Sequence, residues 1–451
     1  DMTTQETIAA IATPRGTGGI GVIRVSGPLV PSLIEPLVGK PLTPLLAHVG
    51  PFYDESQGVL DEGLALYFAN PHSFTGEDVL ELQGHGSPVV QGMILDHLFA
   101  MGVRLARPGE FSERAFLNGK KDLAEVEAIA DLIDAQSTRS ATMALRSLCG
   151  EFSRAIRALM DQLTQLRIYV EASIDFPEEE IDFLSNQQLM RQFSALKEQL
   201  QKTRQSVTKG VIIREGVKLV LVGEPNVGKS SFLNWLTGED TAIVSDAPGT
   251  TRDVLKSDIL LDGVPIHVLD TAGLRQTEDK IEQEGIKRAE AALQEADHIL
   301  WIVDASDAIN ESLVRSFATL DHQRLTLVMN KIDLTSTEPG QGEHTGFACP
   351  IIYCSVKKRQ GMELLKKHIL AQADAEQGGE EGQYLARTRH KQALDQAAKH
   401  LEEAESLLAS KQGELLAETL KWAHRDLGEI VGEFTTDDLL GEIFGSFCVG
   451  K

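Results

Sequence analysis

A loop at residues 223–230 carries the clearest chemical signal in the sequence. It reads Gly-Glu-Pro-Asn-Val-Gly-Lys-Ser, follows an apolar run at residues 217–222 and precedes an amphipathic segment. In such a loop the backbone N–H groups wrap phosphate groups, Lys229 reaches the β- and γ-phosphate oxygens, and the Ser230 hydroxyl binds Mg²⁺. The motif requires a strand before it and a helix after it, so this context predicts binding of a nucleoside triphosphate.

Three later motifs predict which nucleotide binds there. Asp-Thr-Ala-Gly at residues 270–273, Asn-Lys-Ile-Asp at 330–333 and Ser-Val-Lys at 355–357 each follow an apolar run. Asp270 can hold Mg²⁺ through water, and the Gly273 N–H can sense the γ-phosphate. Asp333 can accept hydrogen bonds from the N1–H and exocyclic amine of guanine, a donor pair that adenine lacks. Together the motifs predict a GTPase.

Residues 244–253 lie between the loop and Asp270 and are interpreted as the first switch region, with Thr251 as a second Mg²⁺ ligand. Leu274 stands where Ras-like enzymes carry the glutamine that orients the attacking water. Because leucine cannot do so, another group, a partner or an ion must assist hydrolysis. A monovalent cation held by Asn226 and switch carbonyls is one such arrangement. The residues expected to contact GTP are Asn226, Val227, Gly228, Lys229, Ser230, Ser231, Ser245, Asp246, Ala247, Pro248, Gly249, Thr250, Thr251, Asp270, Thr271, Ala272, Gly273, Asn330, Lys331, Asp333, Ser355, Val356 and Lys357.

The chain divides by pattern into four ranges. Residues 1–119 combine Gly and Pro with short β-like runs, which predicts an α+β domain. Residues 120–213 and 380–451 carry apolar residues at helical spacing, whereas 214–379 alternate strands with amphipathic helices. We therefore predict a multidomain α+β fold in which a P-loop GTPase α/β domain is inserted into a discontinuous helical domain. Such insertion is tolerated when the ends of the inserted unit lie close together.

The composition is that of a soluble globular protein with a strong acidic bias. The formal net charge of −24 disfavours general nucleic-acid binding by the chain alone, because phosphate contacts dominate that affinity. A local basic patch or a basic partner would still permit RNA binding. We find no apolar run of about 18 residues and no secretory signal, so no membrane span is expected. The four cysteines show no metal-ligand pattern and favour a reducing cytoplasm.

Two further patterns are rejected as functional sites. Residues 16–21 match the Gly-x-Gly-x-x-Gly pattern of dinucleotide-binding folds, but a β-branched run follows where that fold requires a helix. His85 lies between two glycines, and no second His or Cys stands nearby at metal-ligand spacing. A histidine in a turn is the better interpretation of this position.

The sequence resembles the MnmE (TrmE) family of tRNA-modification GTPases over nearly its whole length. The similarity rests on residues 223–230, Gly-Thr-Thr-Arg-Asp at 249–253, Asp-Thr-Ala-Gly-Leu-Arg at 270–275, Phe-Cys-Val-Gly-Lys at 447–451, and the segments 73–78 and 110–116. The resemblance implies a folate-binding N-terminal domain that forms a homodimer, a helical domain and an inserted GTPase domain. It also implies K⁺-stimulated GTP hydrolysis in the cytoplasm.

With an FAD-dependent partner, MnmG (GidA), members of this family modify C5 of the wobble uridine at position 34 of certain tRNAs. The resemblance implies that this chain helps to install an aminomethyl or carboxymethylaminomethyl group there. The one-carbon unit would come from 5-formyl- or 5,10-methylenetetrahydrofolate.

The resemblance also implies roles for single residues. Asn226 matches the side-chain ligand of K⁺, and Ser245, Ala247 and Thr250 lie on the K⁺-binding loop. Glu282 matches the acidic residue that orients water indirectly. The implied folate contacts are Arg24, Glu81, Lys120 (with neighbouring Lys121 as the alternative) and Lys451. Cys448 matches a C-terminal cysteine expected to act in the modification chemistry. The predicted catalytic residues are therefore Lys229, Thr251, Glu282 and Cys448.

A ribosome-assembly switch is the main alternative, a GTPase that binds rRNA and performs no covalent chemistry. Such proteins share the switch motifs and the apolar residue after Asp-x-x-Gly. They usually carry a basic RNA-binding module, which the acidic composition of this chain does not suggest.

Overall fold

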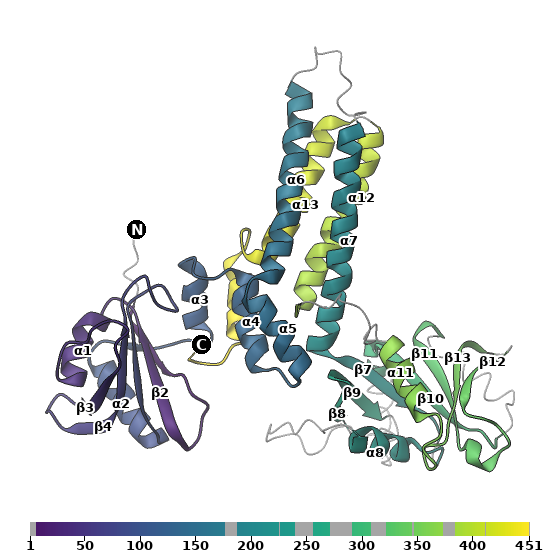
Figure 1. Cartoon of the computed structure of the whole chain (residues 1–451), viewed down its shortest axis with the longest axis horizontal. Helices are drawn as coiled ribbons and strands as arrows, with labels where there is room; N and C mark the ends of the chain where they lie inside the picture. Colours follow the sequence, from purple (N-terminus) through teal and green to yellow (C-terminus); the bar gives the residue numbers. More distant parts are fainter. Residues whose placement is uncertain are drawn as a thin grey trace, which may run out of the picture. The chain divides into compact units, whose positions relative to one another are not determined.

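The computed structural model of the 451-residue chain describes residues 6–175, 187–224, 226–239, 256–270, 291–307, 322–344, 347–372, 384–410 and 412–450. Contacts divide the chain into two compact units. The first comprises Asp1–Ala130, Ser147–Leu189 and His400–Lys451, and the second comprises Asp131–Arg146 and Met190–Lys399. Each unit therefore joins segments that are far apart in the sequence, as the colours of Figure 1 indicate.

The N-terminal part of the first unit is a six-stranded sheet with helices. Strand order is β3-β4-β5-β2-β1-β6, and only β1 and β6 pair in parallel. The strands are β1 (Ile8–Ile11), β2 (Gly18–Ser26), β3 (His48–Tyr53), β4 (Val59–Phe68), β5 (Val79–Gly86) and β6 (Arg104–Leu105); the helices are α1 (Val30–Val38), α2 (Pro88–Ala100) and α3 (Glu110–Leu117). Apolar residues of α1 and α2 form one core cluster with β2, β4 and β5. The pleat places alternate strand residues in this core.

Both rejected patterns fall in this sheet. Gly18–Ser26 form strand β2, so the rejection of a dinucleotide-binding loop is confirmed. The prediction of a turn histidine was wrong, because His85 belongs to strand β5 and its Nδ1 lies 2.7 Å from Oδ1 of Asp61 on neighbouring β4. Within the part of the chain that the structure describes, no three His, Cys, Asp or Glu residues cluster as a metal site would require.

A buried ionic network joins α3 to the sheet. The Arg114 guanidinium donates to the Glu77 carboxylate at 3.0 Å and to Glu110 at 3.1 Å. The Ser26 hydroxyl donates to Glu77 at 2.6 Å, and Arg104 donates to Glu110 at 2.7 Å. Burial acts to raise the pKa of Glu110, but these hydrogen bonds and charges outweigh it and lower the pKa to about 2. Glu110 is therefore ionised at neutral pH.

Four helices of different length complete the described part of the first unit. They are α4 (Leu123–Ile133), α6 (Glu151–Asp175), α13 (Gly413–Val431) and α14 (Asp437–Gly445), and α12 (Thr388–Ala409) ends in this unit. Helix α6 packs along α13, as Figure 1 shows. The Thr436 hydroxyl caps α14 by accepting from the Leu439 N–H at 3.3 Å, as a threonine N-cap should. Apolar residues of α14 then pack against α4 and bring the C-terminal segment to the sheet domain.

The second unit contains a seven-stranded sheet of order β12-β13-β11-β10-β7-β9-β8. Its five central strands are parallel and its two edge strands antiparallel. The strands are β7 (Val217–Val222), β8 (Lys256–Leu261), β9 (Val264–Asp270), β10 (His298–Asp304), β11 (Leu325–Asn330), β12 (Gly340–His344) and β13 (Phe347–Tyr353). Apolar clusters cover both faces, because parallel strands are buried on both sides.

Helices surround this sheet and lead into it. They are α5 (Thr138–Leu148), α7 (Gln187–Glu215), α8 (Lys229–Glu239) and α11 (Met362–Gln372), with short 3₁₀ turns at His322–Arg324 and Ile332–Leu334. The chain passes from α7 into β7 through Gly216, where φ is 78° and a Cβ would lie 2.7 Å from the Pro265 carbonyl oxygen. The chain returns beside this point, because the Glu215 carboxylate accepts from the N–H and the hydroxyl of Thr388 at 3.0 and 2.6 Å.

The predicted multidomain architecture is confirmed in its broad form, with an α+β N-terminal domain, a helical part and a parallel α/β sheet. The predicted boundaries at 119/120 and 213/214 remain predictions, and the one at 379/380 lies outside the described residues. Among the helices that the structure describes, none is both long and apolar enough to cross a membrane.

Replacing Arg114 by Met is expected to destabilise the N-terminal sheet by about 3–5 kcal/mol, because Glu77 would lose its buried counter-ion. Hydrogen exchange of amides in β2 and β5 of the full chain measures this loss. The control is Arg107→Met, since the Arg107 side chain is 63% exposed and pairs with the same helix. It should cost under about 1 kcal/mol. Equal losses in the two variants would contradict the assigned role of Arg114.

Candidate nucleotide-binding site

The phosphate-binding loop lies between β7 and α8, as its sequence predicts. Lys229 begins α8 and is buried, and its ammonium group donates to the carbonyl oxygens of Gly223 at 2.5 Å and Glu224 at 2.8 Å. These contacts hold the charge over the loop, where a β- or γ-phosphate would lie. Ser230 is exposed beside it at the helix N-terminus, where backbone N–H groups favour anions.

The side chain of Asn330 joins this loop to the base-binding motifs. Its Nδ2 donates to the Val227 carbonyl oxygen at 2.8 Å, and its Oδ1 accepts from the Val356 N–H at 3.1 Å. Gly228, with φ of 104°, passes so close that a Cβ there would lie 2.3 Å from Asn330 Nδ2. The predicted residues of three separate motifs are therefore brought together around one buried carboxamide.

The Asp333 carboxylate is oriented by the serine of the Ser-Val-Lys motif. The Ser355 hydroxyl donates to Oδ1 of Asp333 at 2.5 Å and accepts from the Lys358 N–H at 3.2 Å. Asp333 is half-buried beside a cleft of about 550 Å³. This arrangement fixes the direction of the carboxylate that the sequence predicts to accept two hydrogen bonds from guanine.

The cleft also contains residues that the motifs did not predict. Its predicted lining residues are Asn226, Gly228, Ser231, Asn330, Lys331, Asp333, Val356 and Lys357. Asn234 and Trp235 lie one helical turn after Ser231 on α8, and Leu334 and Arg359 follow the two base-side motifs. The i+3 and i+4 spacing from Ser231 could have identified the first two.

Asp304 is a further residue that sequence reasoning missed. It ends β10, between β7 and β11, and its carboxylate accepts from the Lys331 ammonium at 2.6 Å. Burial acts to raise the pKa of Asp304, but hydrogen bonds from Lys331 and Ser306 outweigh it and lower the pKa. The ionised carboxylate therefore holds Lys331 at the edge of the cleft.

Several predicted residues of this site lie outside the described residues. These are the switch positions Ser245, Asp246, Ala247, Pro248, Gly249, Thr250 and Thr251, the Thr271–Gly273 segment, and Leu274 and Glu282. Asp270 ends β9, and its backbone pairs in register with Leu221 of β7. The end of β9 therefore lies beside β7, the strand that leads into the phosphate loop.

Two predicted folate contacts form one ion pair in the N-terminal sheet. Arg24 and Glu81 are cross-strand partners on β2 and β5, and the guanidinium donates to the carboxylate at 2.9 and 3.0 Å. The guanidinium also lies 5.5 Å from the ring centre of Phe74 and 5.8 Å from that of Phe111. A cation near two aromatic rings and paired with a carboxylate brings together the groups that suit a flat, polar ring ligand.

The other residues predicted to act in the N-terminal domain come from other segments of the chain. Lys120 donates to the Pro71 carbonyl oxygen at 2.9 Å, in the loop that also carries Phe74. The Cys448 side chain is exposed, and its carbonyl oxygen accepts from the Gly109 N–H at 3.3 Å, just before α3. The C-terminal segment therefore reaches the sheet domain. Lys451 lies outside the described residues.

A phosphate-binding loop after an interior strand of a parallel sheet, together with an Asn-x-x-Asp motif, defines a P-loop protein of the GTPase class. Residues 7–120 match the family described as GTP-binding protein TrmE N-terminus, and residues 123–448 match the MnmE helical domain. The chain therefore belongs to the MnmE (TrmE) family.

Relatives of similar length support this assignment. The tRNA modification GTPase MnmE of Hydrogenovibrio crunogenus is 51% identical over 455 residues, covering 100% of both chains. The protein of the same name from Chromohalobacter salexigens is 52% identical, covering 99% of this chain and 98% of that one. The corresponding Coxiella burnetii protein is 51% identical over 99% of both.

Solved structures match a smaller part of the chain. The G domain of the T. maritima FeoB iron transporter is 26% identical, with 35% of this chain and 98% of that chain covered and a TM-score of 0.26. Aquifex aeolicus Era is 24% identical over 41% of this chain and 66% of that chain, with a TM-score of 0.27.

Replacing Asp333 by Asn is expected to weaken GTP binding by roughly 100-fold or more and to favour xanthosine triphosphate. Two hydrogen bonds to a charged acceptor contribute about 3 kcal/mol or more, and asparagine can donate to the additional xanthine oxygen. Competition titration with both nucleotides measures the change.

The control for this variant is Asp307→Asn, an exposed carboxylate shortly after β10 that does not line the cleft. Guanine preference should be unchanged in it. Retained guanine preference in Asp333→Asn would show that another group recognises the base.

Proposed function

We propose that this chain hydrolyses GTP and that the hydrolytic cycle drives modification of C5 of the wobble uridine, position 34, in certain tRNAs. The observation that carries the GTP part is the buried Asn330 carboxamide, which ties the phosphate loop to the base-side motifs. The tRNA part is supported by the full-length similarity to proteins named tRNA modification GTPase MnmE.

In the hydrolytic step, the main contribution of the site is charge stabilisation. Lys229 would move from the loop carbonyls to the β- and γ-phosphate oxygens and stabilise negative charge as the bond to the leaving phosphate breaks. Mg²⁺ held by Ser230 and Thr251 would neutralise phosphate charge. Glu282 would orient the attacking water indirectly, since Leu274 has no polar group for this task.

A potassium ion is proposed as a second cation, beside Mg²⁺, that neutralises the negative charge of the GTP phosphates. Asn226 would supply a side-chain oxygen, and Ser245, Ala247 and Thr250 would complete the ligand set. The conformation of Asn226 supports this role, because φ of 68° is a left-handed conformation in which asparagine is tolerated better than most residues. The exposed side chain lies at the mouth of the cleft.

The N-terminal sheet is proposed to bind a tetrahydrofolate, either the 5-formyl or the 5,10-methylene form. Arg24, Glu81 and Lys120, with Lys451, would contact it, and the ring pair around Arg24 supports a planar ligand. Cys448 would act in the modification chemistry, where the C-terminal segment meets α3.

We further propose a cytoplasmic homodimer through the N-terminal domain and a complex with the FAD-dependent MnmG (GidA). A ribosome-assembly switch without covalent chemistry is less well supported, because the similarity to modification GTPases extends over both the N-terminal and helical parts.

Deletion of the gene for this chain is expected to remove the C5 modification from wobble uridines, as measured by mass spectrometry of tRNA nucleosides. A copy carrying Lys229→Ala should fail to restore it, because phosphate binding is lost. Lys218→Ala should restore it, since that exposed lysine of β7 contacts Glu295 away from the cleft. Normal modification in the deleted strain would refute the proposed function.

GTP hydrolysis is expected to be at least about tenfold faster in K⁺ than in Na⁺, because a correctly placed cation replaces an arginine finger. Asn226→Gly should abolish this difference. Glycine accepts the left-handed conformation without strain, so the variant removes only the side-chain ligand. Steady-state phosphate release in matched chloride salts measures both rates, and equal wild-type rates would exclude the cation role.

A further inference from the structure

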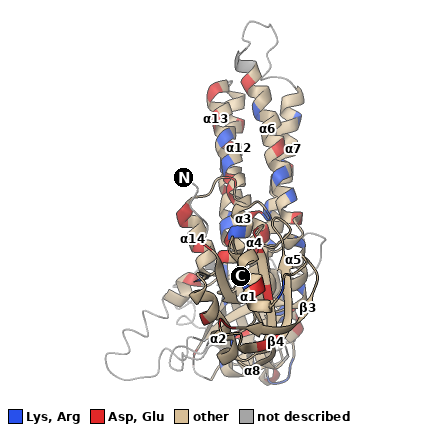
Figure 2. Cartoon of the chain, turned by 90° about the vertical axis from the view of Figure 1, so that its left-hand side faces the viewer, with Lys and Arg blue, Asp and Glu red and all other residues tan. Residues whose placement is uncertain are grey.

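Positive charge is concentrated on two helices of an acidic chain. The chain has a formal net charge of −24, yet α7 carries six Lys and Arg against two Glu. The part of α12 that belongs to the second unit, residues 388–399, carries three Lys and Arg against one Asp. Figure 2 shows blue segments along both helices. This is the kind of local basic surface that an acidic protein needs for contact with a polyanion.

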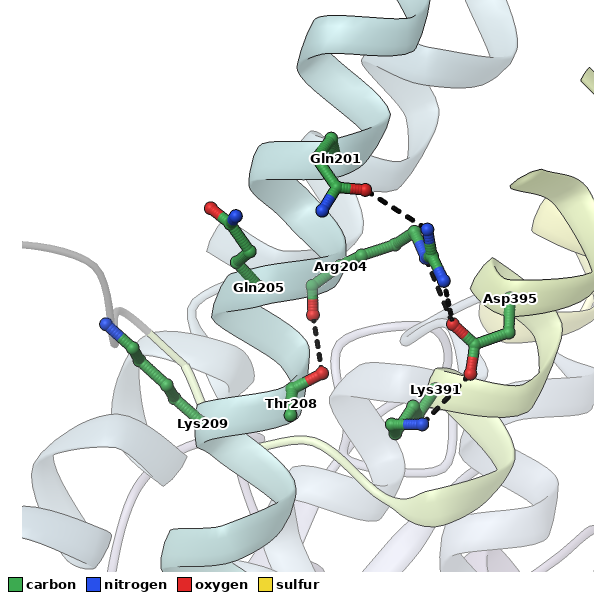
Figure 3. A pocket seen from close by; sticks show the side chains of 7 residues that line it. All are labelled: Gln201, Arg204, Gln205, Thr208, Lys209, Lys391 and Asp395. Carbon is green, nitrogen blue, oxygen red and sulfur yellow. Dashed lines mark hydrogen bonds and ion pairs between the residues drawn. The ribbon is translucent and has the colours of Figure 1, made fainter. Parts of the chain in front are cut away.

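The two helices enclose a polar cleft of about 510 Å³. Its walls consist of Gln201, Arg204, Gln205, Thr208 and Lys209 from α7 and Lys391 and Asp395 from α12. Figure 3 shows Arg204 directed toward Asp395 and the Gln201 amide oxygen turned to the same guanidinium, with Gln205 and Lys209 on the opposite flank of α7. All seven side chains are polar and none is fully buried, which is typical of a surface that contacts a hydrated partner.

Asp395 is the only carboxylate among these lining residues, and it is held by two of the cations. Its carboxylate accepts from Arg204 at 2.6 Å and from Lys391 at 3.0 Å. Burial acts to raise the pKa of Asp395, but these two partners outweigh it and lower the pKa. The ionised Asp395 therefore aligns two cations along the cleft and leaves its walls with a net positive charge.

Further cations continue along α7 beyond the cleft. Arg191, Lys202 and Lys209 are 11 and 7 residues apart, close to three and two helical turns, so they share one face of the helix. Glu198 lies on the same face and its carboxylate pairs with Lys202 at 2.8 Å, so this face keeps a net positive charge from three cations and one carboxylate. Arg191 and Lys209 are 18 residues apart, a distance of about 27 Å along the helix. A single small anion would be bound by convergent, buried donors. A row of this length fits an extended chain of phosphates better.

We propose that the α7–α12 cleft and the row formed by Arg191, Lys202 and Lys209 bind the phosphate backbone of tRNA. This inference rests on the proposed function for the choice of RNA. The contacts are to phosphates, so they position the RNA without reading its sequence. Through this surface the second unit would bind the tRNA directly.

The test uses the full chain and an unmodified tRNA transcript, with binding measured by fluorescence anisotropy at several salt concentrations. The double variant Lys209→Glu with Lys391→Glu should bind at least about tenfold more weakly at about 50 mM salt. The slope of log affinity against log salt should fall by about 1.8, the value for two lost phosphate contacts on a duplex.

The matched control is Lys40→Glu with Lys421→Glu, which makes the same charge change at two exposed lysines of the first unit. It should bind tRNA within about twofold of the wild type. GTP hydrolysis without RNA should be unchanged in both double variants, which shows that the chain is folded.

A second variant tests whether removing a negative charge from the cleft strengthens tRNA binding. Asp395→Asn removes the only negative charge from the cleft walls and frees Arg204 and Lys391 for phosphates. It should bind tRNA several-fold more tightly, whereas a purely structural role of the ion pairs predicts unchanged or weaker binding.

The proposal is overturned if the wild-type chain does not bind the transcript at about 50 mM salt, or if both double variants bind alike. It is also overturned if the cleft variant keeps its RNA affinity and loses binding to a partner protein. Wobble-uridine modification in cells distinguishes this proposal from the proposed function. If the modification depends on this chain but the cleft variant binds tRNA normally, the proposed function stands and the RNA-binding surface is wrong.

Discussion

The nucleotide site depends on one buried side chain, the carboxamide of Asn330. Its two polar atoms bond to the backbone of the phosphate loop and to that of the Ser-Val-Lys motif, which are more than 120 residues apart. Leaving either backbone group unpaired inside the protein would cost about 1–3 kcal/mol. The close approach of Gly228 follows from the same contact, because a larger residue would displace the carboxamide. Phosphate and base recognition are therefore not independent.

Backbone contacts also fix the position of the C-terminal segment. The C-terminal segment reaches the N-terminal sheet domain, where Val449 pairs with Pro108 and the Cys448 carbonyl oxygen accepts from Gly109. Gly109 cannot carry a Cβ, which would lie 2.6 Å from the Phe444 carbonyl oxygen of α14. The exposed thiol of Cys448 is thus positioned by backbone contacts of its neighbours, and a small loop change at Gly109 would displace it.

Much of the nucleotide site could be predicted from sequence because its motifs are contiguous and each follows a strand. Parallel strands bring their carboxyl ends to one edge, so Lys229, Asn330 and Asp333 had to meet once the sheet formed. The pairing of Asp304 with Lys331 and the hydroxyl of Ser355 on Asp333 depend on strand order and side-chain direction. Neither of these two contacts could be predicted from a local sequence pattern.

Other features depend on the adjacency of distant elements. Arg24 and Glu81 were expected at a folate site, but their direct pairing follows from the register of β2 with β5. The interpretation of residues 16–21 succeeded because a strand follows them. That of His85 failed because two flanking glycines suggested a turn where the strand continues. The sequence allowed for a local basic patch, but only the approach of α12 to α7 locates it.

The hydrogen bonds between Glu215 and Thr388 have a mechanical consequence. The polypeptide leaves α7 and returns to α12 through one joint, so the α/β sheet is attached to both helices at the same place. Gly216 gives that joint a conformation closed to most other residues. A rotation of the sheet about this pivot acts on the bases of both helices at once, and these helices form the two walls of the basic cleft. A displacement at this joint would therefore reach both walls of the basic cleft through the helices themselves.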